Sequence, residues 1–237
     1  MTYVVSDIHG CLEQFRRLLK LINFLPNQDR LFILGDVLDR GPHPLSLFLE
    51  IIAMSNVTLL MGNHEEHFLQ ITEMLKKPAD KLTSSEIKKL SDWRIDGGRT
   101  TLKEYNELSD ELKQKVLDYL DHLKRAPAHL EINVNGRAFI LCHGGIPLKS
   151  DGRHYVGEFT NHELINARND YRKPYRDSSK TLITGHTPTF LIDEKYRGKI
   201  YKAYNQIAID CGAVFGNNLG CVCLETIEEF YIKENET

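Results

Sequence analysis

The sequence contains no apolar run close to the ~20 residues that a membrane-spanning helix needs. It also lacks an excess of either charge, with 30 Lys and Arg against 33 Asp and Glu and a formal net charge of −3 at pH 7. These two absences give no support for a membrane or a nucleic-acid partner. Internal repeats and low-complexity segments are absent as well, and 237 residues are enough to bury one sizeable core.

Cysteine is scarce, and its spacing excludes a disulfide framework. The five cysteines are an odd number, and Cys221 and Cys223 share one face of an expected strand without completing a zinc site. Near the N-terminus, Asp7 lies inside what would be the apolar region of a signal sequence. We therefore expect reduced thiols and a cytoplasmic protein.

Short apolar segments, each followed by a glycine-flanked polar turn, organise the first 65 residues. Strands are expected at 3–5, 31–34 and 57–61, with amphipathic helices at 11–24 and 45–54 between them. This β-α-β-α-β alternation indicates an α/β sheet with helices on its faces. The three turns read Ser6-Asp7-Ile8-His9-Gly10, Gly35-Asp36-Val37-Leu38-Asp39-Arg40-Gly41 and Gly62-Asn63-His64-Glu65.

Three turns rich in Asp, Asn and His at successive strand ends are the strongest functional signal in the sequence. Parallel strands of open α/β sheets present their functional groups at their carboxyl ends. In the first turn, Asp7 and His9 alternate along what we expect to be extended backbone, so their side chains should point the same way and could hold one ion. Taken singly, each turn could equally be a helix cap or a charged surface loop.

The middle of the chain has a different character. Residues 66–130 are charged and helical in pattern, and we expect them to form a helical insertion that covers part of the site and sets specificity. A helix over 108–123 begins at a cap formed by Ser109. The single tryptophan, Trp93, precedes Gly97-Gly98 and could line a pocket or anchor the packing.

Strand patterns return from residue 132, at 139–142, 181–184, 207–210 and 219–224, and residues 233–237 read as a frayed tail. His143 and His186 each follow one of these strands, and Arg168 lies between them. Six strand-end groups could hold metal ions: Asp7, His9, Asp36, Asn63, His143 and His186. Asp39, Arg40, His64 and Arg168 lie beside them in the sequence motifs.

Carboxylate, imidazole and amide ligands without thiolate suit Mn, Fe, Zn and similar divalent ions. Six ligands with one bridging carboxylate suit two ions that lie ~3.5–4 Å apart. The guanidinium of Arg40, in the same turn as Asp36 and Asp39, could hold a phosphate. The residues therefore predict a two-metal site for a phosphate compound.

These motifs, together with His143-Gly144-Gly145 and Gly185-His186-Thr187-Pro188, resemble the signature of the phosphoprotein phosphatase family of calcineurin-like metallophosphoesterases. More narrowly, the chain resembles the bacterial and bacteriophage serine/threonine protein phosphatases, from residue 3 to about 225. The stretch 96–102 is similar to the Asn-Gly-Gly-x-x-Thr segment of the bacterial members. Ser6 departs from the usual glycine and Cys211 from a common threonine, and neither change removes a ligand.

The resemblance implies one metallophosphoesterase domain over 1–237, built from two facing mixed β-sheets flanked by helices, with the helical insertion at about 66–130. It implies two divalent ions, Mn as the first choice and Fe, Zn, Ni or Co as alternatives. Asp7, His9 and Asp36 would bind the first ion. Asp36 would bridge to a second ion held also by Asn63, His143 and His186.

The resemblance also implies a mechanism. Arg40 and Arg168 would hold the phosphoryl oxygens while a metal-bridging hydroxide attacks phosphorus in line. His64 would protonate the leaving alkoxide, and Asp39 would orient that imidazole and raise its pKa. The expected substrate is a phosphorylated protein or peptide; the oligomeric state stays open.

Three alternatives accompany this reading. The first is a phosphoanhydride hydrolase of the diadenosine-tetraphosphatase type, which has the same fold and metals; the Gly-Gly-Arg-Thr-Thr stretch at 97–101 favours the protein phosphatase. The second is a metal-bound binding module without activity, which would have no need of His64 as an acid. The third is a phosphodiesterase or nuclease, which the acidic charge balance does not favour.

Overall fold

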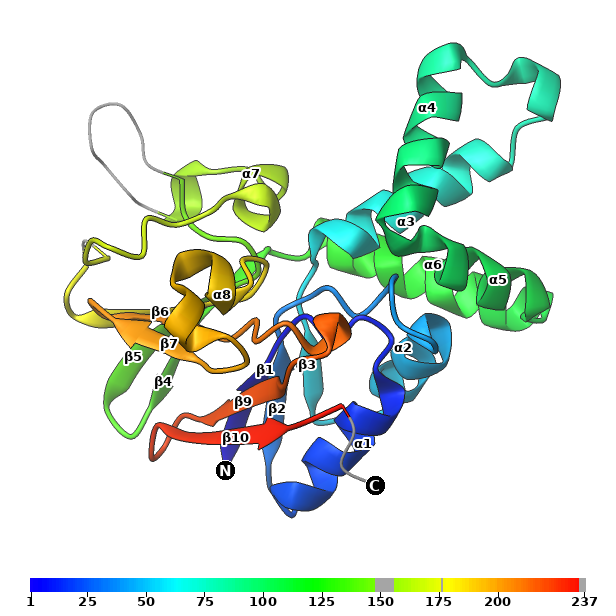
Figure 1. The fold of residues 1–237 in the computed structure, drawn as a ribbon. Helices are drawn as coiled ribbons and strands as arrows, with labels where there is room; N and C mark the ends of the chain where they lie inside the picture. Colours follow the sequence, from blue (N-terminus) through cyan, green and yellow to red (C-terminus); the bar gives the residue numbers. More distant parts are fainter. Residues whose placement is uncertain (148–155, 176, 235–237) are drawn as a thin grey trace.

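The structure, a computed structural model, describes residues 1–147, 156–175 and 177–234. Its strands form two five-stranded mixed sheets, as the family resemblance implies, with the orders β10-β9-β1-β2-β3 and β4-β5-β6-β8-β7 (Figure 1). The strands are β1 (Thr2–Val5), β2 (Arg30–Ile33), β3 (Val57–Leu59), β4 (His129–Val134), β5 (Arg137–Cys142), β6 (Lys180–Thr184), β7 (Tyr201–Ala203), β8 (Gln206–Ala208), β9 (Leu219–Cys223) and β10 (Glu228–Ile232).

Each sheet combines three adjacent parallel strands with two antiparallel ones. In the first sheet β1, β2 and β3 are parallel, whereas β9 and β10 run antiparallel to their neighbours. In the second, β5, β6 and β8 are parallel, and β4 and β7 are antiparallel edge strands. The parallel strands are the ones that lead into the polar turns, so their carboxyl ends carry the candidate site residues.

Alternate residues of the strands serve two different cores. Tyr3 and Val5 of β1 pack under the helices, whereas Val4 faces the second sheet. Phe139 and Leu141 of β5 face the first sheet in return. The alternation of strands and helices predicts helices on the faces of the first sheet; helices cover one face, and the second sheet covers the other.

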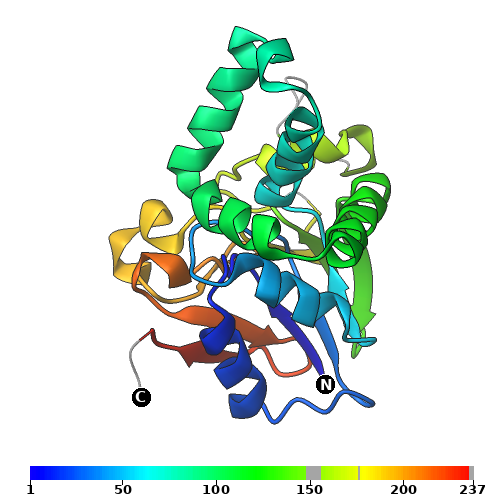
Figure 2. The ribbon, with the colours of Figure 1, turned by 90° about the vertical axis from the view of Figure 1, so that its right-hand side faces the viewer.

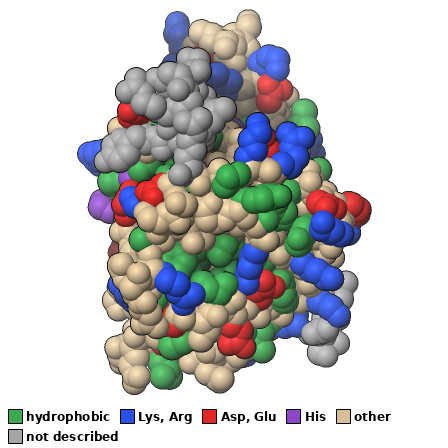
Figure 3. Space-filling view, turned by 90° about the vertical axis from the view of Figure 1, so that its left-hand side faces the viewer, with side chains coloured by type: hydrophobic (Ala, Val, Ile, Leu, Met, Phe, Trp, Pro, Cys, Tyr) green, Lys and Arg blue, Asp and Glu red, His purple; other side chains and the backbone are tan. Residues whose placement is uncertain are grey.

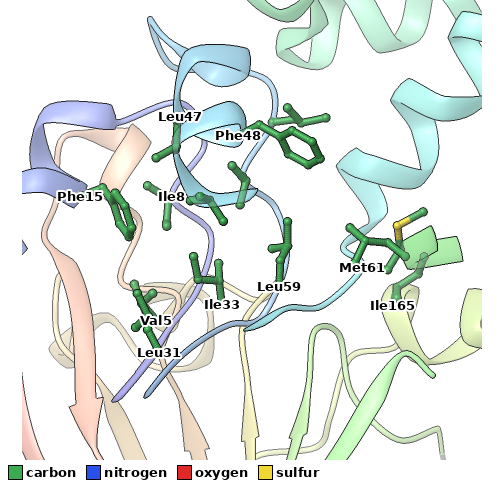
Figure 4. Packing of buried hydrophobic residues seen from close by; sticks show 14 of the residues in the cluster. Val5, Ile8, Phe15, Leu31, Ile33, Leu47, Phe48, Leu59, Met61 and Ile165 are labelled. Atoms are coloured by element: carbon green, nitrogen blue, oxygen red, sulfur yellow. The ribbon is translucent and has the colours of Figure 1, made fainter. Parts of the chain in front are cut away.

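The helical layer over the first sheet is apolar on its inner side. Figure 4 shows Phe15 of α1 and Leu47 and Phe48 of α2 on the side of the sheet that these helices cover. The strand residues beneath them are Val5, Leu31, Ile33 and Leu59. The helices are α1 (Leu12–Leu21), α2 (Pro44–Ile52), α3 (Asn63–Leu75), α4 (Ser84–Trp93), α5 (Arg99–Glu107), α6 (Asp110–Arg125), α7 (Asn161–Asn166) and α8 (Thr189–Ile192). Among the helices of the described residues, none combines the length and the apolar character that a bilayer span requires.

The segment expected to be a helical insertion holds α3 to α6, which Figures 1 and 2 show grouped together beyond the carboxyl end of β3. The Ser109 cap is confirmed, since its side chain accepts a hydrogen bond from the backbone N–H of Leu112. Glu104 of α5 fixes this layer to α2, because its carboxylate accepts the backbone N–H groups of Leu45 (2.7 Å) and Ser46 (3.1 Å) at the start of that helix.

The first sheet has one strand more than the sequence predicts, because β10 pairs with β9 from Glu228 to Ile232. Gly97-Gly98 interrupts the helical path, as the glycine pair predicts: Gly97 has a non-helical φ of +110°, and the π-helical turn Arg94–Gly98 joins α4 to α5 across a kink. Of the expected frayed tail, 235–237 lie outside the described residues.

The outer surface on the side of the second sheet is mixed in character. Figure 3 shows hydrophobic side chains that reach this surface with Lys and Arg side chains among them. Leu191 of α8 and Tyr204 of the β7–β8 turn are exposed hydrophobic residues. This mixture agrees with the small net charge of the chain.

Gly35 provides a test of the close approach between the loops that follow β2 and β3. Its φ is +86°, and a methyl group on its Cα would lie 2.6 Å from the backbone of Gly62. Gly35→Ala should therefore lower the free energy of unfolding by roughly 2–5 kcal/mol, combining left-handed strain with overpacking. Chemical denaturation measures the change.

Gly136→Ala is the matched control. Gly136 also has a positive φ (+76°), but its added methyl group would meet no atom within 4 Å. Only the cost of the left-handed conformation, about 1–2 kcal/mol, should remain. Equal losses in the two variants would show that the approach of the two loops carries no cost of its own.

Candidate metal centre

The polar turns from both sheets converge at one edge of the sandwich. Within the first sheet, the backbone N–H of His9 donates to the carbonyl of Asp36 (2.9 Å), so the turns after β1 and β2 are joined. Between the sheets, His143 Nδ1 hydrogen-bonds to the Leu34 carbonyl (2.5 Å), and the His186 backbone N–H donates to the Asp7 carboxylate (3.0 Å). Five strand ends distant in the sequence thus form one site.

The backbone of this site is largely left-handed. Residues in this conformation are strained when they carry a Cβ, and such strain concentrates at functional sites. The expectation of extended backbone between Asp7 and His9 is therefore wrong. Six candidate residues have positive φ: Asp7 (52°), His9 (44°), Asp36 (53°), Asp39 (66°), Arg40 (68°) and His186 (62°).

Asp36 is the residue that two groups of potential metal ligands share. One group is His9, Asp36 and His64, and the other is Asp36, His143 and His186; within each group the ligand atoms lie within 4.8 Å of one another. Asp36 Oδ2 lies 3.7 Å from His9 Nε2, and Oδ1 lies 3.3 Å from His143 Nε2. This arrangement is the one expected for a carboxylate that bridges two ions.

Two of the imidazoles are oriented by their second nitrogen. His9 Nδ1 donates to the carbonyl of Leu38 (2.8 Å), and His143 Nδ1 does so to that of Leu34. Their Nε2 atoms are therefore directed towards Asp36. A metal-binding histidine is usually held in this way by a backbone carbonyl or a carboxylate.

Asp7, predicted as a ligand, lies outside these two groups of histidine and carboxylate ligands, and the predicted ligand Asn63 lies next to the second of them. The Asp7 carboxylate accepts hydrogen bonds from Ser6 Oγ and from the His186 backbone. Asn63 Oδ1 lies 3.0 Å from His143 Nε2. The Asn63 oxygen is thus next to a ligand atom of the second group, and the Asp7 carboxylate is next to the backbone of His186.

The ionisation states at the site favour cation binding. Burial and the nearby His64 lower the pKa of His9 well below its usual range, and burial and His143 lower that of His186 to about 3. Burial acts against charge on Asp36, yet His143 and His64 hold the pKa of its carboxyl well below the usual value. Metal ions bind neutral imidazole and ionised carboxylate, so these groups are already in the required form.

His143 shows what this cluster would gain from a cation. Burial opposes a charge on the imidazole, but the Asp36 carboxylate beside it raises the pKa of His143 to about 10. Its protonated Nε2 faces the oxygens of Asp36 and Asn63. A divalent ion would satisfy the same oxygens, and its binding would release that proton. The donor set therefore fits a divalent metal.

Asp39 and His64 form a buried pair next to Asp36. His64 Nδ1 donates to Asp39 Oδ2 (2.7 Å), which also accepts the indole N–H of Trp93 (2.8 Å). Thr101 Oγ1 donates to the other oxygen, Oδ1 (2.5 Å). Burial would lower the pKa of His64, but the charge of Asp36 and the bond to Asp39 raise it. The raised pKa favours the protonated imidazole of His64, which is the form that can act as an acid.

The two predicted phosphate-binding arginines lie at the site. Arg40 Nη1 donates to His9 Nε2 (2.7 Å) and Nη2 to Asp96 Oδ1 (3.1 Å). Arg168 Nη1 donates to Thr187 Oγ1 (3.0 Å), one residue after His186. One guanidinium therefore stands beside each of the two groups of ligands.

Glu65 is a site residue whose role the sequence analysis missed. It is fully buried, and Oε2 accepts the backbone N–H groups of Asp36 (2.8 Å) and Gly62 (3.0 Å). Oε1 accepts those of Val37 (2.9 Å) and Leu38 (3.0 Å). The position of a glutamate at the third residue of α3 is a capping-box signal, but the sequence does not show that it also reaches the preceding loop.

The π-helical turn contributes residues that the prediction left without a role. Trp93 has both of the functions considered for it, because it is buried and bonded to Asp39 and also lines a cavity. Asp96 Oδ2 lies 3.7 Å from His64 Nε2. Gly97 packs on Arg40, where a Cβ would lie 2.4 Å from Cγ. This turn thus closes one side of the site.

Comparisons with known proteins agree with this architecture. The sequence model of the calcineurin-like phosphoesterase family matches residues 2–207 of this chain. The symmetrical bis(5′-nucleosyl)-tetraphosphatase of Acidovorax ebreus is 38% identical over 86 residues, which cover 36% of this chain and 31% of that protein. The match thus spans about a third of the length of this relative.

Solved structures show the same fold. A candidate diadenosine tetraphosphatase superposes with a TM-score of 0.62 at 19% identity, covering 98% of this chain and 92% of the other. A Saccharomyces cerevisiae protein serine/threonine phosphatase with similarity to human PP5 also gives 0.62, at 14% identity, covering 100% and 80%. With its two mixed sheets, shared aspartate and matched residues 2–207, this chain belongs to the calcineurin-like phosphoesterase family.

Proposed function

We propose that this chain is a metal-dependent hydrolase of phosphoanhydrides, of the bis(5′-nucleosyl)-tetraphosphatase type. The observation that carries the chemistry is Asp36, which stands between two groups of metal ligands beside the His64–Asp39 pair. The substrate class is supported by the relative from Acidovorax ebreus, which is named as a symmetrical bis(5′-nucleosyl)-tetraphosphatase.

Two divalent ions, manganese by preference, would be held by the strand-end ligands. One ion would be bound by Asp7, His9 and Asp36. The other would be bound by Asp36 and by three further residues: Asn63, His143 and His186. When bound, such ions lower the pKa of water and offset the negative charge of phosphate.

The chain's own residues position the substrate and move a proton. Arg40 and Arg168 stand on either side of the ligand groups and would bind phosphoryl oxygens through their planar forks. Contacts with both would turn the phosphorus towards Asp36. His64 Nε2 lies 4.0 Å from Asp36 Oδ2 and carries the proton that the leaving oxygen would accept.

A protein serine/threonine phosphatase is the second candidate, supported by the resemblance of the stretch 96–102. In the structure Gly97 packs on Arg40, Gly98 on Trp93, and Thr101 bonds to Asp39. These contacts position Arg40, the proposed phosphate ligand, and Asp39, the partner of the proposed acid His64. Hydrolysis of either substrate would need both groups. The stretch therefore does not favour a phosphoprotein over a dinucleotide.

The substrate class is tested by hydrolysis of bis(5′-adenosyl) tetraphosphate, a phosphoserine peptide and a phosphodiester, each with Mn²⁺ and with EDTA. We expect the highest kcat/KM for the dinucleotide, two molecules of ADP as its products, and loss of turnover in EDTA that added Mn²⁺ restores. Preferred turnover of the phosphopeptide would replace this proposal with the second candidate. No turnover of any of the three would leave a binding module.

His64→Asn tests the acid. Asparagine cannot supply the proton, so kcat should fall by roughly 10²–10⁴-fold while the bound metal, measured by elemental analysis, stays unchanged. The loss should be larger for a phosphoserine ester than for the anhydride, because an alkoxide is the poorer leaving group. Loss of metal in the variant would instead make His64 a ligand, as its place in the first group allows.

Glu65→Gln tests the support of the ligands. One carboxylate oxygen becomes an NH₂ group that faces two backbone N–H donors, so Mn²⁺ affinity should fall roughly 10–100-fold. The free energy of unfolding should also fall, by about 1.5–3 kcal/mol. Chelator competition and denaturation measure the two effects.

Glu66→Gln is the matched control, because it removes the same charge one residue later. Glu66 bonds to His162 and to none of the loop N–H groups, so metal affinity should not change. Identical behaviour of the two variants would mean that the network around Glu65 does not support the ligands.

A further inference from the structure

A cavity of about 360 Å³ lies between α3, α4, the π-helical turn and α7, beside the proposed acid. Its volume is within the roughly 300–1,000 Å³ of small-molecule sites. The lining residues used below are His67, Gln70, Ile71, Met74, Trp93 and Asp96.

The cavity lies near the atom that would protonate the leaving group. Asp96 lines it and lies 3.7 Å from His64 Nε2. The ring of His67 lies 6.2 Å from that of His64, between centroids. Trp93 forms part of the wall and bonds to Asp39, the partner of His64. A leaving group that departs towards His64 would therefore place the substituent attached to it in this cavity.

The walls of the cavity suit a flat, neutral ring. Ile71, Met74 and Trp93 are buried apolar residues, and Phe68 stacks on Trp93 at 5.9 Å and so fixes that wall. Burial and His64 lower the pKa of His67, which keeps its imidazole neutral near pH 7. Within the described part of the chain, the nitrogens of His67 have no hydrogen-bond partner, so they can face a ligand.

The charges around the cavity disfavour a second phosphate. Two carboxylates, Asp92 and Asp96, lie in its lining, against one ammonium group from Lys89. Carboxylates and the Gln70 amide are instead partners for the amino and ring-nitrogen edges of a nucleobase. Polar partners around an apolar wall are typical of sites that bind a heterocycle.

We propose that this cavity is the subsite for the nucleoside of the leaving nucleotide, with its base between His67 and the apolar wall. The inference rests on the proposed function, since it assigns a place to one half of the dinucleotide. It also gives the helical segment a role, because all but one of the lining residues belong to it; the exception is His162 of α7.

The test compares the affinity of ADP with that of pyrophosphate, which lacks the nucleoside, by calorimetry of the Mn²⁺-loaded protein. ADP should bind more tightly to the wild type. Gln70→Trp, which fills the cavity from an exposed position, and His67→Ala, which removes the ring, should each reduce this preference for ADP by about tenfold. Ile87→Trp is the control: Ile87 is 52% exposed on α4 and lines no part of the cavity, so the preference should persist.

Equal affinity of ADP and pyrophosphate for the wild type, or a preference unchanged in both cavity variants, would overturn the subsite. If the two cavity variants instead lost affinity for a phosphoserine peptide and kept their preference for ADP, the cavity would belong to a peptide side chain. That result would also overturn the proposed nucleoside subsite. Hydrolysis of bis(5′-adenosyl) tetraphosphate by the same preparations separates the two proposals. Normal hydrolysis with an unchanged preference removes only the subsite, whereas absent hydrolysis removes the proposed function on which it rests.

Discussion

The buried carboxylate of Asp36 is the interaction on which the rest of the site depends. It receives imidazoles from the first sheet through His9 and from the second through His143. Two sheets with separate strand orders are thereby joined at their functional edge. Without a cation the cluster balances its charge by protonation of His143, whose pKa is raised to about 10. A metal-binding site and a sheet-to-sheet connection are therefore the same set of atoms.

The position of Asp36 in turn depends on an unusual backbone. The loop that carries it is left-handed at three residues besides Gly35, and Glu65 binds four N–H groups from this loop and the next. A loop rich in positive φ is strained, so it needs partners that fix it from outside. Glycines allow the close approach, since Gly35 and Gly62 pack with almost no space between them.

The helical layer adds chemistry that the metal-binding turns do not contain. Asp39 is fully buried, and both of its oxygens are bonded, one to His64 and Trp93 and the other to Thr101. Trp93 and Thr101 belong to helices α4 and α5, which follow the third strand. Of these two helices, α4 also lines the cavity next to His64, together with α3, the π-helical turn and α7. The proposed acid and the proposed nucleoside subsite thus share the side chain of Trp93.

The sequence by itself determined which groups are available and at which strand ends they stand, because apolar segments and the polar turns after them are local patterns. It also determined the helices over 66–130 and the cap at Ser109. The left-handed backbone at Asp7 and His9, the four contacts of Glu65 and the pairing of β10 were decided only by the tertiary structure. Each depends on partners far along the chain. The Glu65 carboxylate accepts hydrogen bonds from N–H groups up to 29 residues away, and α7 contacts α3 although β4 and β5 separate them in the sequence. Distances of this kind leave no periodic signal in a sequence, so the cavity beside His64 became visible only when the elements were packed together.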